Sequence, residues 1–125
     1  AVGDVDGDLD LDLLISHNDR PAVLLRNDAP RLGHAIALDL RSRHAGRPAV
    51  GARVTVRGGG RTWVAETMAG GTYQGQHTPL LHVGLGDVDR VDEVVVRWPD
   101  GERQTVAGDA IALDAVTRLD QPAAP

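Results

Sequence analysis

The sequence predicts an all-β protein built as a sandwich or a barrel. Short apolar or alternating runs recur from one end of the chain to the other, and Gly, Pro and Asp separate them. No long stretch shows the apolar stripe of an amphipathic helix. Aromatic residues make up only 2% of the chain, so Val, Leu, Ile and Ala must build most of the core.

The expected strands share an apolar period of two and cover residues 11–15, 22–26, 34–40, 52–57, 61–67, 80–83, 93–98, 103–106 and 110–113. Pro99-Asp100-Gly101 predicts a hairpin, because Pro presets φ, Asp closes the turn and Gly accepts a positive φ. Gly58-Gly59-Gly60 separates two further runs and predicts a second hairpin.

Charge and composition exclude several classes of protein. The 13 basic residues are outnumbered by 18 acids, the net charge is -5, and nothing along the chain resembles a basic stripe. We therefore expect no nucleic-acid partner. Cysteine is absent, which excludes disulfides and thiolate zinc sites, and no apolar run approaches the ~20 residues of a membrane span.

Five aspartates occupy every second position near the start of the chain: Asp4, Asp6, Asp8, Asp10 and Asp12. If the segment curls, the side chains of Asp4, Asp6, Asp8 and Asp12 and the main-chain carbonyl of Asp10 can converge on one hard cation. Ca²⁺ prefers such a flexible shell of oxygens, so a calcium loop is predicted. A solvated acidic turn without metal, or a loop that has lost its metal, are the alternatives.

The segment Asp-Val-Asp-Gly-Asp-Leu-Asp-Leu-Asp-Leu-Leu-Ile resembles the FG-GAP/VCBS-type repeat of integrin-like β-propellers. The resemblance implies that residues 1–30 are a partial β-propeller blade whose loop binds Ca²⁺, with further repeats of the same protein upstream. Leu9 departs from the repeat, which usually has Gly there for a sharp turn. A bulky residue disfavours positive φ.

A second resemblance covers about residues 34–115. It is carried by the segments 51–56, 70–76, 81–86 and 91–101, which are similar to the ASPIC/UnbV domain except for Gly75, where Ser is expected. Such domains follow FG-GAP/VCBS repeats in cartilage acidic protein-like and many bacterial exported proteins. The resemblance implies an all-β module with an extracellular, periplasmic or cell-surface location. From the strand pattern we expect a β-sandwich-like module at residues 31–120, followed by a tail at 121–125.

The expected function is a non-catalytic, calcium-binding module with a structural or adhesion role, whose partners include an extracellular protein or a glycan. The polar segment Thr72, Tyr73, Gln74, Gln76 and His77 is a candidate ligand surface, although a long polar connection between strands explains it equally well. A pure structural spacer is a further alternative.

A glycan-active enzyme or an accessory to one is the competing class. It would need a pocket that holds Glu66 or Glu93 beside a histidine, or the two glutamates paired across strands. The five histidines show no ligand spacing, which disfavours zinc. Trp63 and Trp98 lie in alternating runs and are expected to be core or half-buried residues, whereas exposure of both on one face would favour carbohydrate recognition.

Overall fold

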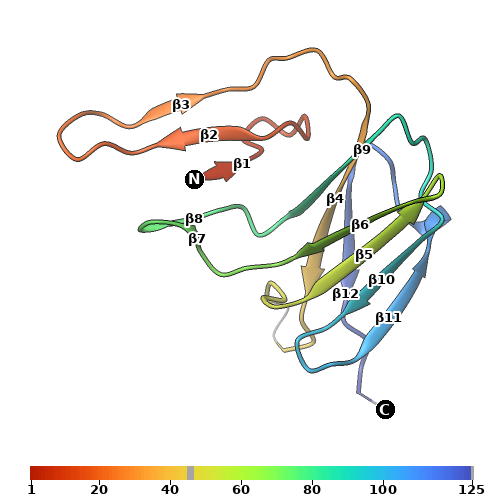
Figure 1. The fold of residues 1–125 in the computed structure, drawn as a ribbon. Coiled ribbons are helices and arrows are strands. Elements are labelled where there is room, and N and C mark those ends of the chain that lie inside the picture. Colours follow the sequence, from red (N-terminus) through yellow and green to blue (C-terminus); the bar gives the residue numbers. More distant parts are fainter. Residues whose placement is uncertain (45–46, 125) are drawn as a thin grey trace.

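The computed structural model describes residues 1–44 and 47–124, and the chain forms an all-β fold as predicted. Figure 1 shows a sandwich-like body and an elongated N-terminal sheet beside it. No helix in these ranges is long and apolar enough to cross a membrane.

Two facing sheets form the body. The first has the order β11 (Arg103–Ala107), β10 (Glu93–Arg97), β5 (Arg53–Gly58), β6 (Arg61–Glu66), with every pair antiparallel. The second has the order β12 (Val116–Asp120), β4 (His34–Arg41), β9 (Leu81–Gly86). In it β12 runs parallel to β4, while β9 is antiparallel to β4.

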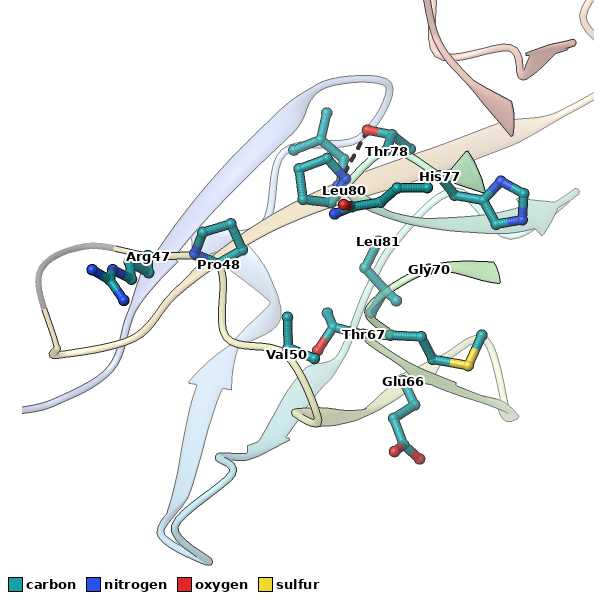
Figure 2. Close-up of a pocket in the computed structure, with 13 residues that line it drawn as sticks. Arg47, Pro48, Val50, Glu66, Thr67, Gly70, His77, Thr78, Leu80 and Leu81 are labelled. Carbon is teal, nitrogen blue, oxygen red and sulfur yellow. Dashed lines mark hydrogen bonds between the residues drawn. The ribbon is translucent and has the colours of Figure 1, made fainter. Parts of the chain in front are cut away.

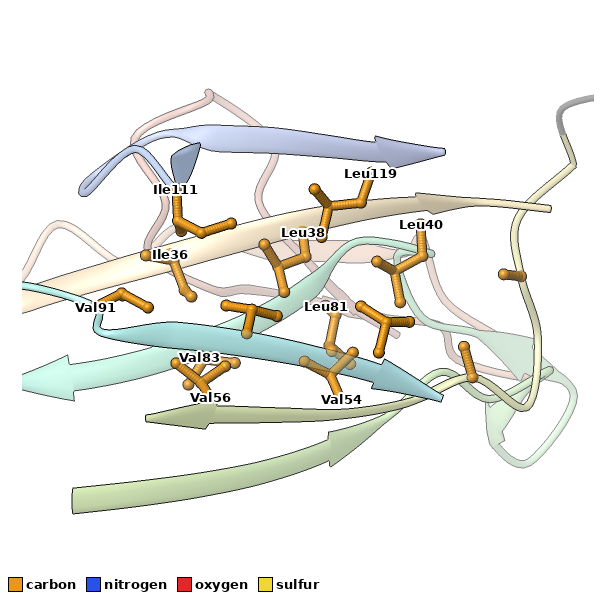
Figure 3. Close-up of a cluster of buried hydrophobic side chains, with 14 of the residues drawn as sticks. Ile36, Leu38, Leu40, Val54, Val56, Leu81, Val83, Val91, Ile111 and Leu119 are labelled. Atoms are coloured by element: carbon orange, nitrogen blue, oxygen red, sulfur yellow. The ribbon is translucent and has the colours of Figure 1, made fainter. Parts of the chain in front are cut away.

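The core lies between these sheets because each strand turns its alternate apolar residues inward (Figure 3). Ile36, Leu38 and Leu40 of β4 meet Val54 and Val56 of β5, and all five side chains are essentially fully buried. Burying one such side chain stabilises a fold by about 1.5–3 kcal/mol. Packed Val, Ile and Leu side chains therefore form most of the core of a chain that has few aromatic residues.

Both predicted hairpins are confirmed. The Gly58–Arg61 turn joins β5 to β6, with Gly59 and Gly60 at positive φ. In the β10–β11 hairpin the Gly101 N–H donates to the carbonyl of Trp98, and the Glu102 N–H donates to the Asp100 carboxylate over 3.1 Å. Local turn chemistry therefore fixed both registers.

The end of the chain differs from the prediction. Residues 110–113 were expected to form a strand, but a 3₁₀ turn at Gly108–Ala110 (η1) leads into an irregular segment, and the last strand is β12. Asp114 takes a φ of 53°, and its N–H donates to the carbonyl of Ala35. The chain bends there to align β12 with β4, a long-range pairing that its own pattern did not reveal.

The N-terminal sheet has the order β1 (Val2–Gly3), β2 (Asp12–Ile15), β3 (Val23–Leu25), all antiparallel. A short hairpin, formed by β7 (Gly71–Thr72) and β8 (Gly75–Gln76), extends from the body toward this N-terminal sheet (Figure 1). The predicted division near residue 30 falls in the connection between β3 and β4.

Candidate metal loop and its surroundings

The aspartate loop occupies the connection between β1 and β2 and is held by its own carboxylates. Asp4 accepts hydrogen bonds from the backbone N–H of Gly7 (2.7 Å) and of Leu9 (2.9 Å), and Asp8 accepts from the N–H of Asp10 (2.8 Å). Gly7 supplies the positive φ of 83° that lets the chain curl. Short Asp side chains thus turn an alternating segment into a loop instead of a strand.

This curl gathers three of the predicted ligands. Oxygens of Asp4, Asp6 and Asp8 all lie within 4.8 Å of one another. Burial raises the pKa of the Asp6 carboxyl, and repulsion from Asp8 and Asp12 raises it further. Arg26 lies 3.7 Å from Asp6, although its closer partner is Asp28 at 2.6 Å. Negative charge is therefore concentrated at the cluster and only partly balanced.

Asp12, the fourth predicted side-chain ligand, is placed differently. It is only 2% exposed, and its two oxygens accept hydrogen bonds from the N–H of Val5 and of Asn27, each over 2.8 Å. These two donors hold the pKa of Asp12 below its ordinary value. Asp12 thereby ties the loop to the end of β3, and its carboxylate is not among the three that cluster.

Leu9 takes the conformation for which the repeat would use Gly. Its φ is 69°, and its side chain is 7% exposed. A non-glycine residue in this region costs about 1–2 kcal/mol. Burial of the leucine side chain offsets that strain, because removing it from water contributes about 1.5–3 kcal/mol.

The loop docks on the body near β4 and β9. Leu9 and Asp10 line a hollow of about 510 Å³ together with His34, His82 and Gly84. Asp10 otherwise contributes its backbone N–H to the loop, and its carboxylate stays outside the cluster.

Arg31 and Asp114, which the sequence did not single out, connect this loop to the body. The Arg31 guanidinium donates to the main-chain carbonyl of Asp8 and lies 3.2 Å from Asp114. Asp114 also lies 2.7 Å from the Nδ1 atom of His34, and this contact lowers the pKa of Asp114. No linear motif relates these residues, since they come from three distant segments.

The candidate ligand surface at residues 72–77 divides into two parts. Tyr73 stands at the tip of the β7–β8 hairpin and is 92% exposed, and Gln74 beside it has a φ of 55°. His77 instead faces the N-terminal sheet, where its Nδ1 atom accepts a hydrogen bond from the N–H of Val2 over 2.9 Å. Thr72 and Gln76 belong to the hairpin strands. The hairpin tip at Tyr73 is therefore exposed to solvent, whereas His77 is hydrogen-bonded to β1.

A cavity of about 400 Å³ lies beside this hairpin and is mostly apolar, with Val50, Met68 and Leu81 among its lining residues (Figure 2). Glu66 and His77 also border it, but Figure 2 shows the Glu66 carboxylate and the His77 ring pointing away from each other. The acid-base pair that the enzyme hypothesis needs is thus not assembled there.

Other candidate groups are separated by the sheet register. Glu66 is the cross-strand partner of Arg53, while Glu93 is opposite Arg57, so the two glutamates are not paired. Across residues 1–44 and 47–124, the three loop carboxylates form the only group of three or more metal-ligating side chains.

The tryptophans pack as predicted. Trp98 is 1% exposed, and its indole N–H donates to Gln104 over 3.1 Å, while Trp63 packs against the core. Burial excludes stacking of a sugar on Trp98, while Trp63 is partly buried against the core, so the two rings do not form an exposed platform.

Two facing sheets with a carboxylate loop outside their core define an all-β module whose chemistry lies at its periphery. The chain belongs to the ASPIC and UnbV family, because the family profile matches residues 42–125. This confirms the predicted ASPIC/UnbV domain, and the match begins directly after β4. No curated protein matches the chain.

Proposed function

We propose that the aspartate loop binds Ca²⁺ and that residues 1–30 are part of an FG-GAP/VCBS-type repeat joined to the ASPIC/UnbV domain. The observation that carries this proposal is the convergence of Asp4, Asp6 and Asp8 within 4.8 Å. Oxygens that bind one Ca²⁺ lie about 2.3–2.6 Å from it, hence within about 5 Å of each other. The cluster has the spacing that such an ion requires.

The metal would act structurally. Three carboxylates this close repel one another, and a divalent cation neutralises them. The carbonyl of Asp10 and a remaining lone pair of Asp12 would be further ligands, and Asp12 would have to turn toward the cluster to reach the ion. Loop order, and with it the anchoring of β2, would then depend on the Ca²⁺ concentration.

Both faces of the β2–β3 pair are apolar, which supports the proposal that further repeats of the same protein pack on them. Register places Leu13 with Leu25 and Ile15 with Val23 on one face, and Leu14 with Leu24 on the other. All six side chains are between 39% and 49% exposed. A strand pair that is apolar on both faces is typical of a sheet covered on both sides.

The proposed role of the chain is therefore a non-catalytic module of an exported or cell-surface protein that stabilises a repeat array or presents a binding surface. The affinity expected of an extracellular module is weak, at about 10⁻⁴–10⁻³ M. This range suits a site that is occupied outside the cell.

Calorimetric titration with Ca²⁺, accompanied by thermal melting, tests the proposal. We expect saturable binding and a higher melting temperature, and both should disappear in the variant Asp6→Asn/Asp8→Asn. The matched control is Asp89→Asn/Asp109→Asn, which removes the same charge outside the loop. Absence of binding at millimolar Ca²⁺, or equal loss in the control, would refute a calcium site here.

A further inference from the structure

Three arginines lie side by side in one row across the outer face of the four-stranded sheet. Arg97 of the central strand β10 is the direct partner of Arg53 on β5 and of Arg103 on β11. Direct partners in antiparallel strands point to the same face. Their neighbours Val54 and Val96 are buried in the core, so the three guanidinium groups face outward. We call Arg53, Arg97 and Arg103 the arginine row.

The arginine row carries an excess of positive charge, because its three arginines are followed by one acid, Glu66 on β6, the cross-strand partner of Arg53. Among the described residues, no carboxylate forms an ion pair with any of the three. Glu93, at the other end of β10 from Arg97, is paired with Arg57. Neighbouring strands are about 4.8 Å apart, so the row places three positive charges within about 10 Å. Like charges directly opposite each other destabilise a sheet, and an anion laid across them would relieve that cost.

The surface around the row is suited to an extended ligand. A shallow hollow of about 260 Å³ is lined by Arg53, Thr55, Arg57, Val95, Arg97 and Arg103. Arginine presents a planar fork that binds carboxylate and sulfate oxygens through two parallel N–H groups. Closely spaced oxyanions on one chain would therefore each meet a guanidinium.

We propose that the arginine row binds an anionic polysaccharide through its carboxylate or sulfate groups. Backbone N–H and C=O groups of β5 and β10 are used within the sheet, so a polypeptide could add a strand only at an edge strand, β11 or β6, and would not cross the row. A single-stranded nucleic acid would need aromatic side chains for base stacking. Trp98 is buried, Trp63 packs on the core, and Tyr73 lies on the distant β7–β8 hairpin (Figure 1). A duplex would need a far longer basic surface than three residues on a chain of net charge -5.

The experiment measures binding of the whole chain to heparin and to alginate, as sulfated and carboxylated polysaccharides, at low ionic strength. Neutral dextran, inorganic sulfate, polyglutamate and single-stranded DNA serve as comparison ligands. The test variant replaces all three arginines of the row by Gln. The control replaces Arg61, Arg90 and Arg118 by Gln, which lowers the net charge equally but removes arginines that are paired with Asp87, Asp92 and Asp120.

We expect binding to one or both anionic polysaccharides that weakens as salt rises, because exposed charges are screened. The row variant should lose affinity by at least about tenfold, which corresponds to about one good charge-assisted contact, while the control stays close to the parent. Dextran and inorganic sulfate should bind neither protein measurably. The row variant should melt no lower than the parent, since the substitutions remove repulsion, and Arg97→Gln alone provides a milder test of the same contact.

Several results would overturn the proposal. Equal weakening in the control would reduce the effect to net charge. Tighter binding of polyglutamate or DNA than of either polysaccharide would assign the row to another class of ligand, and binding of inorganic sulfate at equal sulfate concentration would indicate a small-anion site. The variant Asp6→Asn/Asp8→Asn should bind the polysaccharide normally, so a failure of the calcium proposal leaves this result unaffected.

Discussion

Leu9 shows how one side chain can hold a backbone conformation that its residue type disfavours. The strain of a φ of 69° and the burial of a 7% exposed leucine act against each other at the same position. Burial exceeds the strain by about 1 kcal/mol on ordinary magnitudes. The leucine therefore fits the loop because it also docks the loop on the body.

Two substitutions at Leu9 separate these effects. Leu9→Ala loses the buried side chain but keeps the strained φ, and should cost about 2–3 kcal/mol. Leu9→Gly loses the same side chain but relieves the strain, so it should cost about 1 kcal/mol less. Urea denaturation measures both. At a position with negative φ, Gly would destabilise the fold more than Ala does. A smaller loss of stability in Leu9→Ala than in Leu9→Gly would therefore contradict backbone strain at Leu9.

Asp12 makes the N-terminal sheet sensitive to acid. Its pKa is lowered in the folded chain, so its contribution to stability is fully present above the ordinary aspartate pKa of about 4 and is lost as the pH falls through the lower, folded value. The backbone N–H groups of Val5 and Asn27 should lose their protection from hydrogen exchange over that acid range.

The matched comparison is Asp12→Asn, which cannot ionise. This variant should already exchange faster at neutral pH at Val5 and Asn27, and should lack the acid step. Asp109→Asn should behave as the parent does. A titration midpoint at or above about pH 4 for these amides would contradict the lowered pKa of Asp12.

At the scale of elements, the β7–β8 hairpin is held against β1 by a contact that depends on glycine. A Cβ on Gly71 would lie 2.1 Å from the Cδ2 atom of His77, and the φ of Gly71 is 136°. The same histidine accepts the Val2 N–H, and the Thr78 N–H donates to the Val2 carbonyl over 3.0 Å. Space at Gly71 therefore sets the position of β1.

Gly71→Ala should displace the His77 ring and release the N-terminal strand. Hydrogen exchange at the Val2 amide should accelerate strongly, while the amides of β5 and β10 keep their protection. Gly84→Ala is the control, because a Cβ there meets no atom within 4 Å. Unchanged exchange at Val2 would show that the hairpin tolerates a side chain at Gly71.

The arginine row is only partly predictable from local sequence. The Pro99-Asp100-Gly101 turn, recognised in the sequence, already implies that Arg97 faces Arg103 across the hairpin. Arg53 joins them only because β5 pairs with β10, across a long intervening segment. The three arginines are far apart in the sequence and become neighbours only in the folded sheet.

For the whole molecule, β4 is the strand on which the body depends. The family match begins at residue 42, yet β4 precedes it and lies between β12 and β9 with Ile36, Leu38 and Leu40 buried. The core cluster draws on no residue before Ile36. The N-terminal sheet packs on the outside of this body.

Two truncations test that arrangement. Residues 31–125 should fold cooperatively with Trp98 buried, because the whole core is retained. Residues 42–125 should remain unfolded, because loss of β4 removes four fully buried side chains and leaves β12 and β9 without a partner. Tryptophan fluorescence and circular dichroism measure both. A folded 42–125 fragment would show that β4 is dispensable.

Sequence patterns alone predict the all-β class, most strands, both hairpins, the ASPIC/UnbV domain and the spacing of the aspartates. These features depend on local periodicity and turn chemistry, which neighbouring residues express without help from the rest of the chain. The tryptophan burial followed from the same alternation.

The contacts between distant segments could not be predicted from the sequence and are seen only in the folded chain. The β4–β12 pairing, the docking of Leu9 beside β9, the Val2–His77 bond and the arginine row all join segments that are far apart in the chain. A period of two specifies which face of a strand is apolar, but it does not specify the partner strand or its register. Which strands pair with each other depends on how the complete core packs. This pairing brings together charged groups that are far apart in the sequence.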